Sequence, residues 1–260
     1  MRYGFCNLGI VPMRKEASDA SEMVSQLLFG DAFTIIKDEK NWLFIQNYDD
    51  NYEGWIDVKQ CIRLSSSDFH SYVSTPKKFI KEAIAYVFQS QEGSKDKTIY
   101  PIYLGSQVVS PKFVLSNILF EISENSITKS IITNKIRLSS IAIKYLSTPY
   151  LWGGKSLFGI DCSGFTQMCF KQIGINLLRD ASEQITQGEE IENISLAEAC
   201  DLCFFSNNEG IIIHVGVYLG DGKIIHASGQ VRIDSIDNKG IYRKDINNYT
   251  HRLEKIKRIF

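Results

Sequence analysis

One cysteine and two histidines stand in contexts that favour nucleophilic chemistry. Cys162 lies in the stretch FGIDCSGFTQMCFKQIG, between an aspartate and a serine and just ahead of an apolar run. A thiol at a helix N-terminus faces unpaired backbone N–H groups and the positive end of the helix dipole, and both favour the reactive thiolate. Catalysis also needs a base and a group that holds the oxyanion. His214 and His226, on two successive predicted strands, are the candidate bases.

The apolar pattern places Cys162 in the first turn of a helix. Apolar residues recur after it at helical spacing, namely at Phe165, Met168, Cys169 and Ile173. A cysteine on a helix is often a buried core thiol, and Cys169 fits that interpretation. Cys162 fits it poorly, because its neighbours Asp161 and Ser163 are poor core companions and leave room for a substrate.

Strand register decides whether the two histidines can cooperate. If only the last two residues of the GDG turn formed the loop, Val217 would lie opposite His226 and the histidines would face opposite sides of the sheet. If all three residues formed it, with Gly222 at positive φ, Gly216 would lie opposite His226, on the face of His214 and about 7 Å from it diagonally. We expect the three-residue loop, because glycine stands where the bulge needs it.

Composition and charge exclude several classes of protein. The chain has 260 residues, of which 44% are hydrophobic and 23% charged, as in an ordinary globular protein. The formal net charge of -1 provides no field that would gather nucleic acid, so no nucleic-acid partner is expected. No run of eighteen apolar residues occurs, and we expect no membrane span.

The N-terminus and the cysteines indicate in which cellular compartment the protein is expected. The first residues lack a hydrophobic core followed by a small-residue cleavage site, and six cysteines in a chain this long do not resemble a disulfide scaffold. As written, the chain is expected in the cytoplasm. A signal sequence that had been trimmed away would leave the same trace, and the protein would then be periplasmic or secreted.

The order of strand and helix signals divides the chain into three predicted domains. Residues 1–64 hold short β-rich runs such as IVPMR, AFTIIKD, NWLFIQNY and EGWIDV, typical of a small barrel. Residues 65–130 begin with a polar linker, SSSDFH, and a helical segment around Lys77–Tyr86, and continue as a second small β domain. Residues 131–260 place helices, one of which ends before Pro149, ahead of an antiparallel sheet, and the chain is therefore predicted to be α+β.

The stretches TPYLWGGKSLFGIDCSGF and HVGVYLGDGKIIHASG together resemble the NlpC-type family of papain-like cell-wall cysteine peptidases over residues 131–260. The resemblance implies that Cys162 is the nucleophile, that His214 is the general base and that His226 orients the ring of His214. It also implies that the hydroxyl of Tyr150 helps the Cys162 backbone N–H to hold the oxyanion. Where the family usually has Pro-Gly before the next strand, this chain has Ala-Cys, which affects a loop only.

A second resemblance narrows the substrate. The stretch from Pro12 to Asp57 is similar to a bacterial SH3-like domain, and this domain order resembles that of family members that trim free murein peptides. In those enzymes the first domain helps to hold the free amino terminus of the peptide. The implied reaction releases L-Ala-γ-D-Glu by cutting the bond between D-glutamate and a diamino acid, either diaminopimelate or lysine.

The same resemblance suggests which residues bind the substrate. Asp161 and Ser163 are expected to contact its polar groups through the motif around Cys162. An ammonium group needs an acidic partner, for which we expect Asp180 from the catalytic domain and Glu22 from the first domain, together with Tyr52. Glu22 could also cap a turn, and Tyr52 could be an ordinary strand residue.

Alternative interpretations stay open at this stage. The chain could be a cell-wall peptide-binding protein with a vestigial catalytic half, or an acyltransferase or amidase on the same scaffold. Cys200 and Cys203 could suggest zinc or redox chemistry, but two further ligands at suitable spacing are lacking. We expect no metal or organic cofactor, and His70 and His251 are interpreted as surface or structural residues. The oligomeric state does not follow from the sequence.

Overall fold

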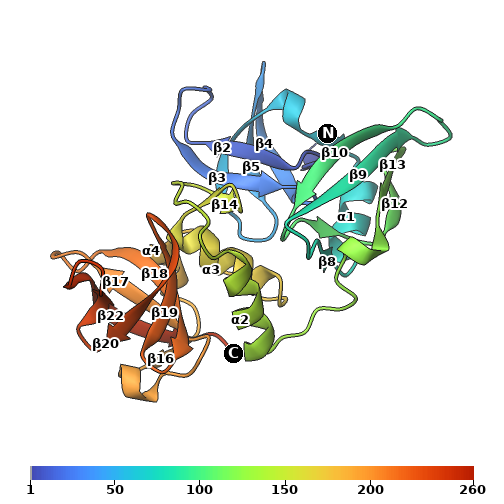
Figure 1. Ribbon diagram of the computed structural model, residues 1–260. Helices are drawn as coiled ribbons and strands as arrows, with labels where there is room; N and C mark the ends of the chain where they lie inside the picture. Colours follow the sequence, from blue (N-terminus) through green and yellow to red (C-terminus); the bar gives the residue numbers. More distant parts are fainter. Residues whose placement is uncertain (1) are drawn as a thin grey trace. The chain divides into compact units, whose positions relative to one another are not determined.

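The computed structural model describes residues 2–260 and divides them into two compact units (Figure 1). Unit 1 comprises residues up to 131 and the short segment 155–157, and unit 2 comprises residues 132–154 and 158–260. The domain bounds 1–64, 65–130 and 131–260 stay a prediction. No helix within residues 2–260 is both long and apolar enough to cross a membrane.

Unit 1 opens with a seven-stranded antiparallel sheet. Its strands are β1 (Tyr3–Phe5), β2 (Ile10–Arg14), β3 (Met23–Leu28), β4 (Ala32–Glu39), β5 (Trp42–Asn47), β6 (Glu53–Asp57) and β7 (Ile62–Leu64), in the order β3-β2-β6-β5-β4-β1-β7. A short 3₁₀ turn, η1 (Val58–Gln60), joins the last two. Alternate residues of β5 are buried, with Leu43 and Ile45 fully inside, as the period of a strand requires.

The segment that follows is organised differently from the prediction. Helix α1 (Ser66–Ser74) occupies the stretch predicted to be a polar linker, because the Ser65 hydroxyl caps it by accepting the Asp68 backbone N–H at 3.1 Å. The predicted helix around Lys77–Tyr86 is wrong. That stretch contains strand β8 (Lys78–Phe79) and the start of β9, in which alternate residues are buried.

The next strands of unit 1 form a four-stranded and a two-stranded antiparallel sheet. They are β9 (Ile84–Gln91), β10 (Thr98–Tyr103), β11 (Gln107–Val108), β12 (Lys112–Leu115) and β13 (Ile118–Ile122), followed by the turn η2 (Glu124–Ser126). The four-stranded sheet has the order β10-β9-β13-β12, and β11 pairs with β8. Strand β14 (Lys155–Ser156) also belongs to unit 1, where the Lys155 backbone N–H donates to Gln26 Oε1 at 2.8 Å.

The two sheets of unit 1 share a hydrophobic core. Phe5 of β1 and Phe29, which directly follows β3, pack with Phe120 of β13, with ring centroids 5.5–5.7 Å apart. Tyr72 of α1 lies in the same cluster, and its hydroxyl donates to the Gly30 carbonyl at 2.8 Å. The sequence-based division at residue 64 therefore separates two sheets that share a core.

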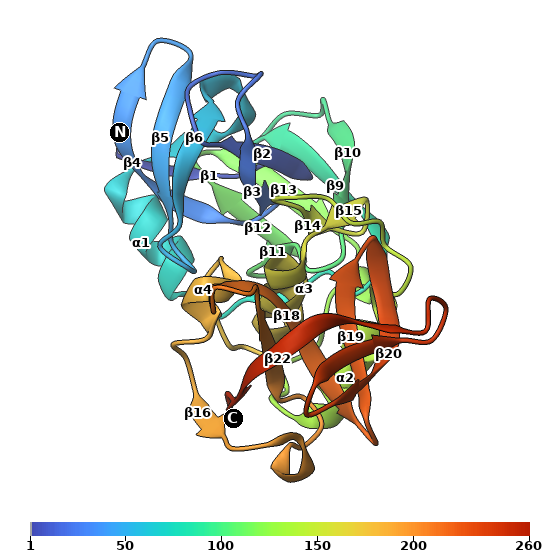
Figure 2. The ribbon, with the colours of Figure 1, turned by 90° about the vertical axis from the view of Figure 1, so that its left-hand side faces the viewer.

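Unit 2 combines helices with a sheet that closes on itself (Figure 2). The helices are α2 (Lys135–Lys144), α3 (Cys162–Lys171) and α4 (Ala181–Gln184), with the turn η3 (Ile194–Leu196). The strands are β15 (Gly159–Ile160), β16 (Glu189–Ile191), β17 (Leu202–Ser206), β18 (Ile212–Gly220), β19 (Lys223–Ser228), β20 (Gln230–Asp237), β21 (Gly240–Arg243) and β22 (Asn248–Arg258). Apart from β15, which lies outside this sheet, their order is β16-β22-β17-β18-β19-β20-β21, and β21 also pairs with β22, which completes a barrel.

Helix α3 is the central element of unit 2. All ten of its residues are buried, and it packs against α2, β18 and β19. Phe165, Met168, Cys169 and Phe170 are each fully inaccessible to solvent. A helix that is surrounded in this way can place its first residue, Cys162, firmly against the strands beside it.

Candidate active site

The N-terminus of α3 is held by Asp161. The Asp161 carboxylate accepts the Gly164 backbone N–H at 2.7 Å, as an N-cap residue does, and the Gly153 backbone N–H at 2.8 Å. A side chain at position 164 would clash, since a Cβ there would lie 2.4 Å from the Gly154 carbonyl oxygen. The DCSG sequence therefore starts the helix at Cys162 and lets the preceding loop approach it closely.

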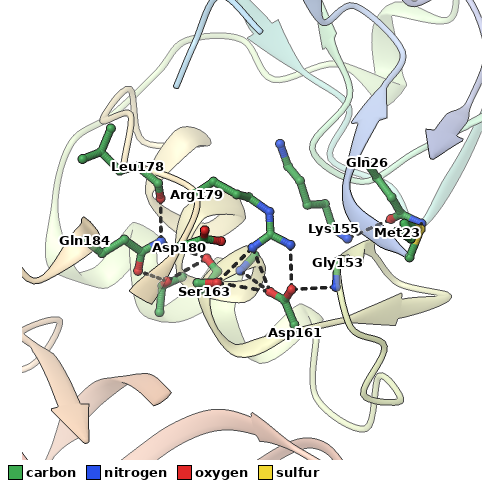
Figure 3. Close-up of polar contacts among 12 residues, drawn as sticks. Met23, Gln26, Gly153, Lys155, Asp161, Ser163, Leu178, Arg179, Asp180 and Gln184 are labelled. Atoms are coloured by element: carbon green, nitrogen blue, oxygen red, sulfur yellow. Dashed lines mark hydrogen bonds and ion pairs between the residues drawn. The ribbon is translucent and has the colours of Figure 1, made fainter. Parts of the chain in front are cut away.

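A buried arginine that sequence reasoning missed supports this cap (Figure 3). Arg179 is 1% exposed, and its guanidinium donates to Asp161 at 2.6 and 3.1 Å and to Ser163 Oγ at 2.9 Å. A carboxylate has about four lone-pair sites. Two backbone N–H groups and two arginine N–H groups fill those of Asp161, so its side chain positions the start of α3. The expected contact of Asp161 with the substrate stays a prediction.

A second set of hydrogen bonds joins α3 to α4. Gln184 is fully buried, and its amide nitrogen donates to the Ser163 carbonyl at 3.0 Å and to the Leu178 carbonyl at 2.8 Å (Figure 3). Thr166 Oγ1 donates to Gln184 Oε1 at 2.7 Å. These contacts tie the segment that carries Arg179 to the helix that carries Cys162.

The Cys162 thiol lies in a nearly dry environment. Cys162 is 7% exposed, and the backbone N–H groups of Val215 and Ser163 interact with its sulfur. Burial, and next the negative charge of Asp161, raise the pKa of the Cys162 thiol to about 12. The helix N-terminus was expected to favour a thiolate, but desolvation outweighs it, and the resting group is a thiol that needs a base when it attacks.

The two histidines lie beside each other on β18 and β19. His214 Nε2 is 2.8 Å from His226 Nδ1, and the rings are almost perpendicular. His226 pairs with Gly216, which confirms the expected register. A Cβ at position 216 would lie only 2.8 Å from the Cβ of His226, so glycine leaves the room that the histidine pair needs.

The turn that sets this register differs from the prediction. The loop contains only Asp221 and Gly222, both at positive φ, and Gly220 pairs with Lys223. The expected three-residue loop is therefore wrong. The register is recovered because β18 shifts between Tyr218 and Gly220, which adds one residue to that strand ahead of the turn.

A second irregularity lies directly before His214. Phe205 pairs with His214 but the next residue, Ser206, pairs with Ile212, so Ile213 is an extra residue in β18. Bulges of this kind redirect the neighbouring side chain. Since Val215, on the other side of His214, interacts with the Cys162 sulfur, the bulge places the histidine in the part of β18 that meets the nucleophile.

A third histidine joins the pair. The ring of His251, on β22, stacks on that of His214 with centroids 4.3 Å apart. Its interpretation as an isolated surface or structural residue missed this position, because β22 comes near His214 only in the folded sheet, where β17 pairs with both β22 and β18. Burial, together with His226 and His251, lowers the pKa of His214 well below its ordinary value of 6.5.

Tyr150 lies in the neighbourhood of the nucleophile, as the sequence resemblance implied. Its backbone N–H donates to the Gly229 carbonyl at 2.9 Å, and the residue forms a bridge with Ile160, just before Asp161. Burial, and next the charges of Cys162 and Asp161, raise the pKa of the Tyr150 phenol. The hydroxyl is therefore protonated at neutral pH and able to donate.

The remaining predicted binding residues are distributed over both units. In unit 2, Asp180 is half-buried before α4, and its backbone N–H donates to Glu183 Oε2 at 3.2 Å. In unit 1, Glu22 is exposed and lies 3.5 Å from Lys15 Nζ. Tyr52 packs against the hydrophobic core of the first sheet, so its side chain contributes to the packing there.

The family of the chain follows from two regions that match known families. Residues 147–249 match the model of the NlpC/P60 family, and residues 13–60 match that of the bacterial dipeptidyl-peptidase SH3 domain. The chain carries a catalytic domain of the NlpC/P60 family of cell-wall cysteine peptidases. The SH3 domain corresponds to the stretch from β2 to η1, as the sequence resemblance indicated.

Two curated relatives are similar over most of their length. The chain is 27% identical over 235 residues to the gamma-D-glutamyl-L-lysine dipeptidyl-peptidase of Bacillus cereus, which covers 81% of this chain and 68% of that protein. It is 28% identical over 261 residues to dipeptidyl-peptidase 6 of Lysinibacillus sphaericus, with 87% and 89% covered.

Solved structures of the family share the fold. The crystal structure of an NlpC/P60 family protein from Bacillus cereus has a TM-score of 0.80 at 20% identity and covers 99% of both chains. An NlpC/P60 endopeptidase from Photobacterium damselae subsp. piscicida has a TM-score of 0.71 at 17% identity, with 98% of this chain and 70% of that one covered. The α+β fold class with SH3-like β regions is thereby confirmed.

The lowered pKa of His214 predicts the acid side of the pH profile. A base with a lowered pKa stays neutral, and therefore competent, as the pH falls through 6.5, and it is lost only where it gains a proton at lower pH. We expect kcat/KM for a murein peptide to keep its plateau through pH 6.5. Steady-state rates between about pH 4 and 8 measure this. A fall centred at or above 6.5 would contradict it.

The buried ion pair predicts a large effect of Arg179→Met. Removing one partner leaves the Asp161 charge buried, and such changes cost about 3–5 kcal/mol of unfolding free energy. The exposed pair of Arg252 with Glu254 offers the control Arg252→Met, for which we expect at most about 1 kcal/mol. Urea denaturation followed by circular dichroism measures both. Equal stabilities for the two variants would show that the Arg179 pair contributes little.

Proposed function

We propose that the chain is a γ-D-glutamyl-L-diamino acid dipeptidyl peptidase that acts on murein peptides with a free amino-terminal L-alanine. It would hydrolyse the bond between D-glutamate and the diamino acid and release L-Ala-γ-D-Glu. The observation that carries the proposal is a buried thiol at the N-terminus of α3, placed against strand β18, whose His214 is hydrogen-bonded to His226 of β19. The name of the Bacillus cereus relative, a gamma-D-glutamyl-L-lysine dipeptidyl-peptidase, supports the substrate class, and the name of the Lysinibacillus sphaericus relative, a dipeptidyl-peptidase, supports release of a dipeptide.

In the proposed reaction His214 acts first as a base and then as an acid. Its Nδ1 takes the thiol proton while Cys162 Sγ attacks the γ-carbonyl carbon of D-glutamate. The Cys162 backbone N–H and the Tyr150 hydroxyl stabilise the oxyanion. His214 then gives the proton to the departing amine of the diamino acid, which leaves a thioester on Cys162.

Hydrolysis of the thioester completes the cycle. His214 takes a proton from water, the hydroxide adds to the thioester carbon, and the proton passes to the leaving sulfur as L-Ala-γ-D-Glu departs. A neutral imidazole suits both half-reactions, since it must accept a proton at the start of each. Burial keeps both Cys162 and His214 uncharged before substrate arrives, and this agrees with the shifts of their pKa values.

We further propose that acidic residues recognise the amino terminus of the peptide. Glu22 of the SH3 domain and Asp180 before α4 are the proposed partners of the ammonium group, with Tyr52 as an additional contact. Ser163, whose hydroxyl accepts from Arg179, would reach substrate polar groups through its remaining hydrogen-bonding capacity.

The proposed reaction predicts a strict requirement for a free amine. We expect mass spectrometry to show cleavage of L-Ala-γ-D-Glu-diaminopimelate and L-Ala-γ-D-Glu-L-lysine but not of the same peptides acetylated at the amino end. Cys162→Ala should abolish cleavage, and Cys169→Ala, a buried thiol on the same helix, should not. Cleavage of the acetylated peptides would refute the amino-end requirement, and no cleavage of any peptide would refute the peptidase.

The proposed ammonium contact predicts a selective defect in Glu22→Gln. A hydrogen bond to a charged group contributes about 1.5–3 kcal/mol, so we expect a roughly 10- to 100-fold loss of kcat/KM for the free-amine peptide. Glu39→Gln, another exposed carboxylate of unit 1, is the matched control and should change kcat/KM less than about twofold. An unchanged kcat/KM in Glu22→Gln would remove this residue from the substrate site.

A further inference from the structure

The hydrogen-bond chain that starts at His214 continues beyond the second histidine. His226 Nε2 lies 3.0 Å from Oδ2 of Asp234, on the neighbouring strand β20. His226 is fully buried and Asp234 is 8% exposed, so solvent does not compete for this contact. Asp234 was not among the residues singled out from the sequence, and the proposed reaction does not use it.

An arginine keeps Asp234 ionised and in place. Arg232 Nη2 donates to Asp234 Oδ1 at 2.9 Å, and Arg232 Nε lies 2.7 Å from Oδ2. Burial acts to raise the pKa of Asp234, but the contacts with His226 and Arg232 hold it below the ordinary value of 3.8. At neutral pH Asp234 is therefore a carboxylate, which can accept a hydrogen bond but cannot donate one.

Because Asp234 is an acceptor at one end of this series of hydrogen bonds, it fixes the position of each proton in the series. Because Asp234 can only accept, the proton of neutral His226 lies on Nε2, and its Nδ1 is left as an acceptor. The 2.8 Å contact then requires His214 to carry its proton on Nε2. The basic nitrogen of His214 is consequently Nδ1, the one that the proposed reaction uses to take the thiol proton.

The other titratable groups around the two histidine rings do not change these proton positions. The titratable groups that face the pair are His251 from β22, Arg232 from β20 and Arg243 from β21. Burial lowers the pKa of His251 to about 4, so it is neutral, and the two arginines can only donate. Among these groups, Asp234 is therefore the one that accepts the hydrogen bond from His226 Nε2.

We propose that Asp234 is a positioning residue that fixes the tautomers of His226 and His214, so that Nδ1 of His214 is always available as the base. The inference rests on the proposed function for its kinetic consequences, but the tautomers themselves do not depend on it. Asp234 touches neither the substrate nor the reacting atoms and acts through the histidine pair alone.

The decisive variant is Asp234→Asn. An amide can donate to His226 Nε2, which moves the proton of His226 to Nδ1 and turns His214 Nδ1 into a donor that cannot accept the thiol proton. We expect kcat to fall on the order of 10²- to 10⁴-fold with KM little changed, as for a wrong tautomer in a serine protease triad. Loss of the anion should also move the acid limb of kcat/KM to lower pH, because a carboxylate favours protonated histidine.

The chain offers a closely matched control. Asp245 accepts from the same Arg232, at 3.2 Å, but belongs to an exposed ion-pair cluster with Arg243. Asp245→Asn should therefore leave kcat within about twofold of the original protein. Asp234→Glu, which keeps an anionic acceptor, should recover part of the activity that Asp234→Asn loses. A similar loss in Asp234→Asn and Asp245→Asn would overturn the assignment, as would full activity of a folded Asp234→Asn protein.

Nitrogen-15 spectra of the histidine side chains test the tautomers without any turnover. We expect Nε2–H signals for both His214 and His226 in the original protein, and an Nδ1–H signal for His226 in Asp234→Asn. His214→Gln and His226→Gln assign the two sets of signals. An Nδ1–H tautomer in the original protein would overturn the inference even if peptides are cleaved. The expected tautomers without peptide cleavage would uphold it and refute the proposed function.

Discussion

The buried pair between Arg179 and Asp161 is the interaction on which the rest of the catalytic unit depends. Asp161 caps α3, receives the loop through the Gly153 N–H and pairs with Arg179 at 2.6 Å, so one carboxylate joins three separate segments. A carboxylate buried in this way is stable only while all of its acceptor sites are used. The two buried charges are stabilised only in this arrangement, and the arrangement fixes the position of the next residue, Cys162.

Burial sets the chemical state of the site as well as its geometry. The helix N-terminus alone would favour a thiolate, and a neighbouring imidazolium would favour it further. Cys162 instead lies next to the charge of Asp161, and His214 is enclosed by two other imidazoles, so both groups are held in their neutral forms. Proton transfer is then coupled to attack on the substrate.

The sequence predicted a helix that shows a clear period, and it missed elements of mixed spacing and contacts that arise only when strands pair. The helix at Cys162 follows from a local pattern. The register of His226 was predicted correctly from a loop that proved wrong, because a bulge in β18 supplies the residue that the loop was expected to hold. The segment Lys77–Tyr86 was misread as helix because its apolar residues occur at mixed spacing, whereas β9 buries alternate residues. Asp234 carries no local signal, since only the pairing of β19 with β20 brings it beside His226.

Two bulges explain how an antiparallel barrel can present a histidine pair at all. Strict alternation over the DG loop would turn His214 and His226 to opposite faces. The extra residue in β18 near the turn returns His214 and His226 to the same face of the sheet. The extra residue Ile213, near the start of β18, redirects the side chain of His214. Gly216 then leaves the space that the ring of His226 occupies, so the catalytic geometry depends on backbone irregularities as much as on the catalytic side chains.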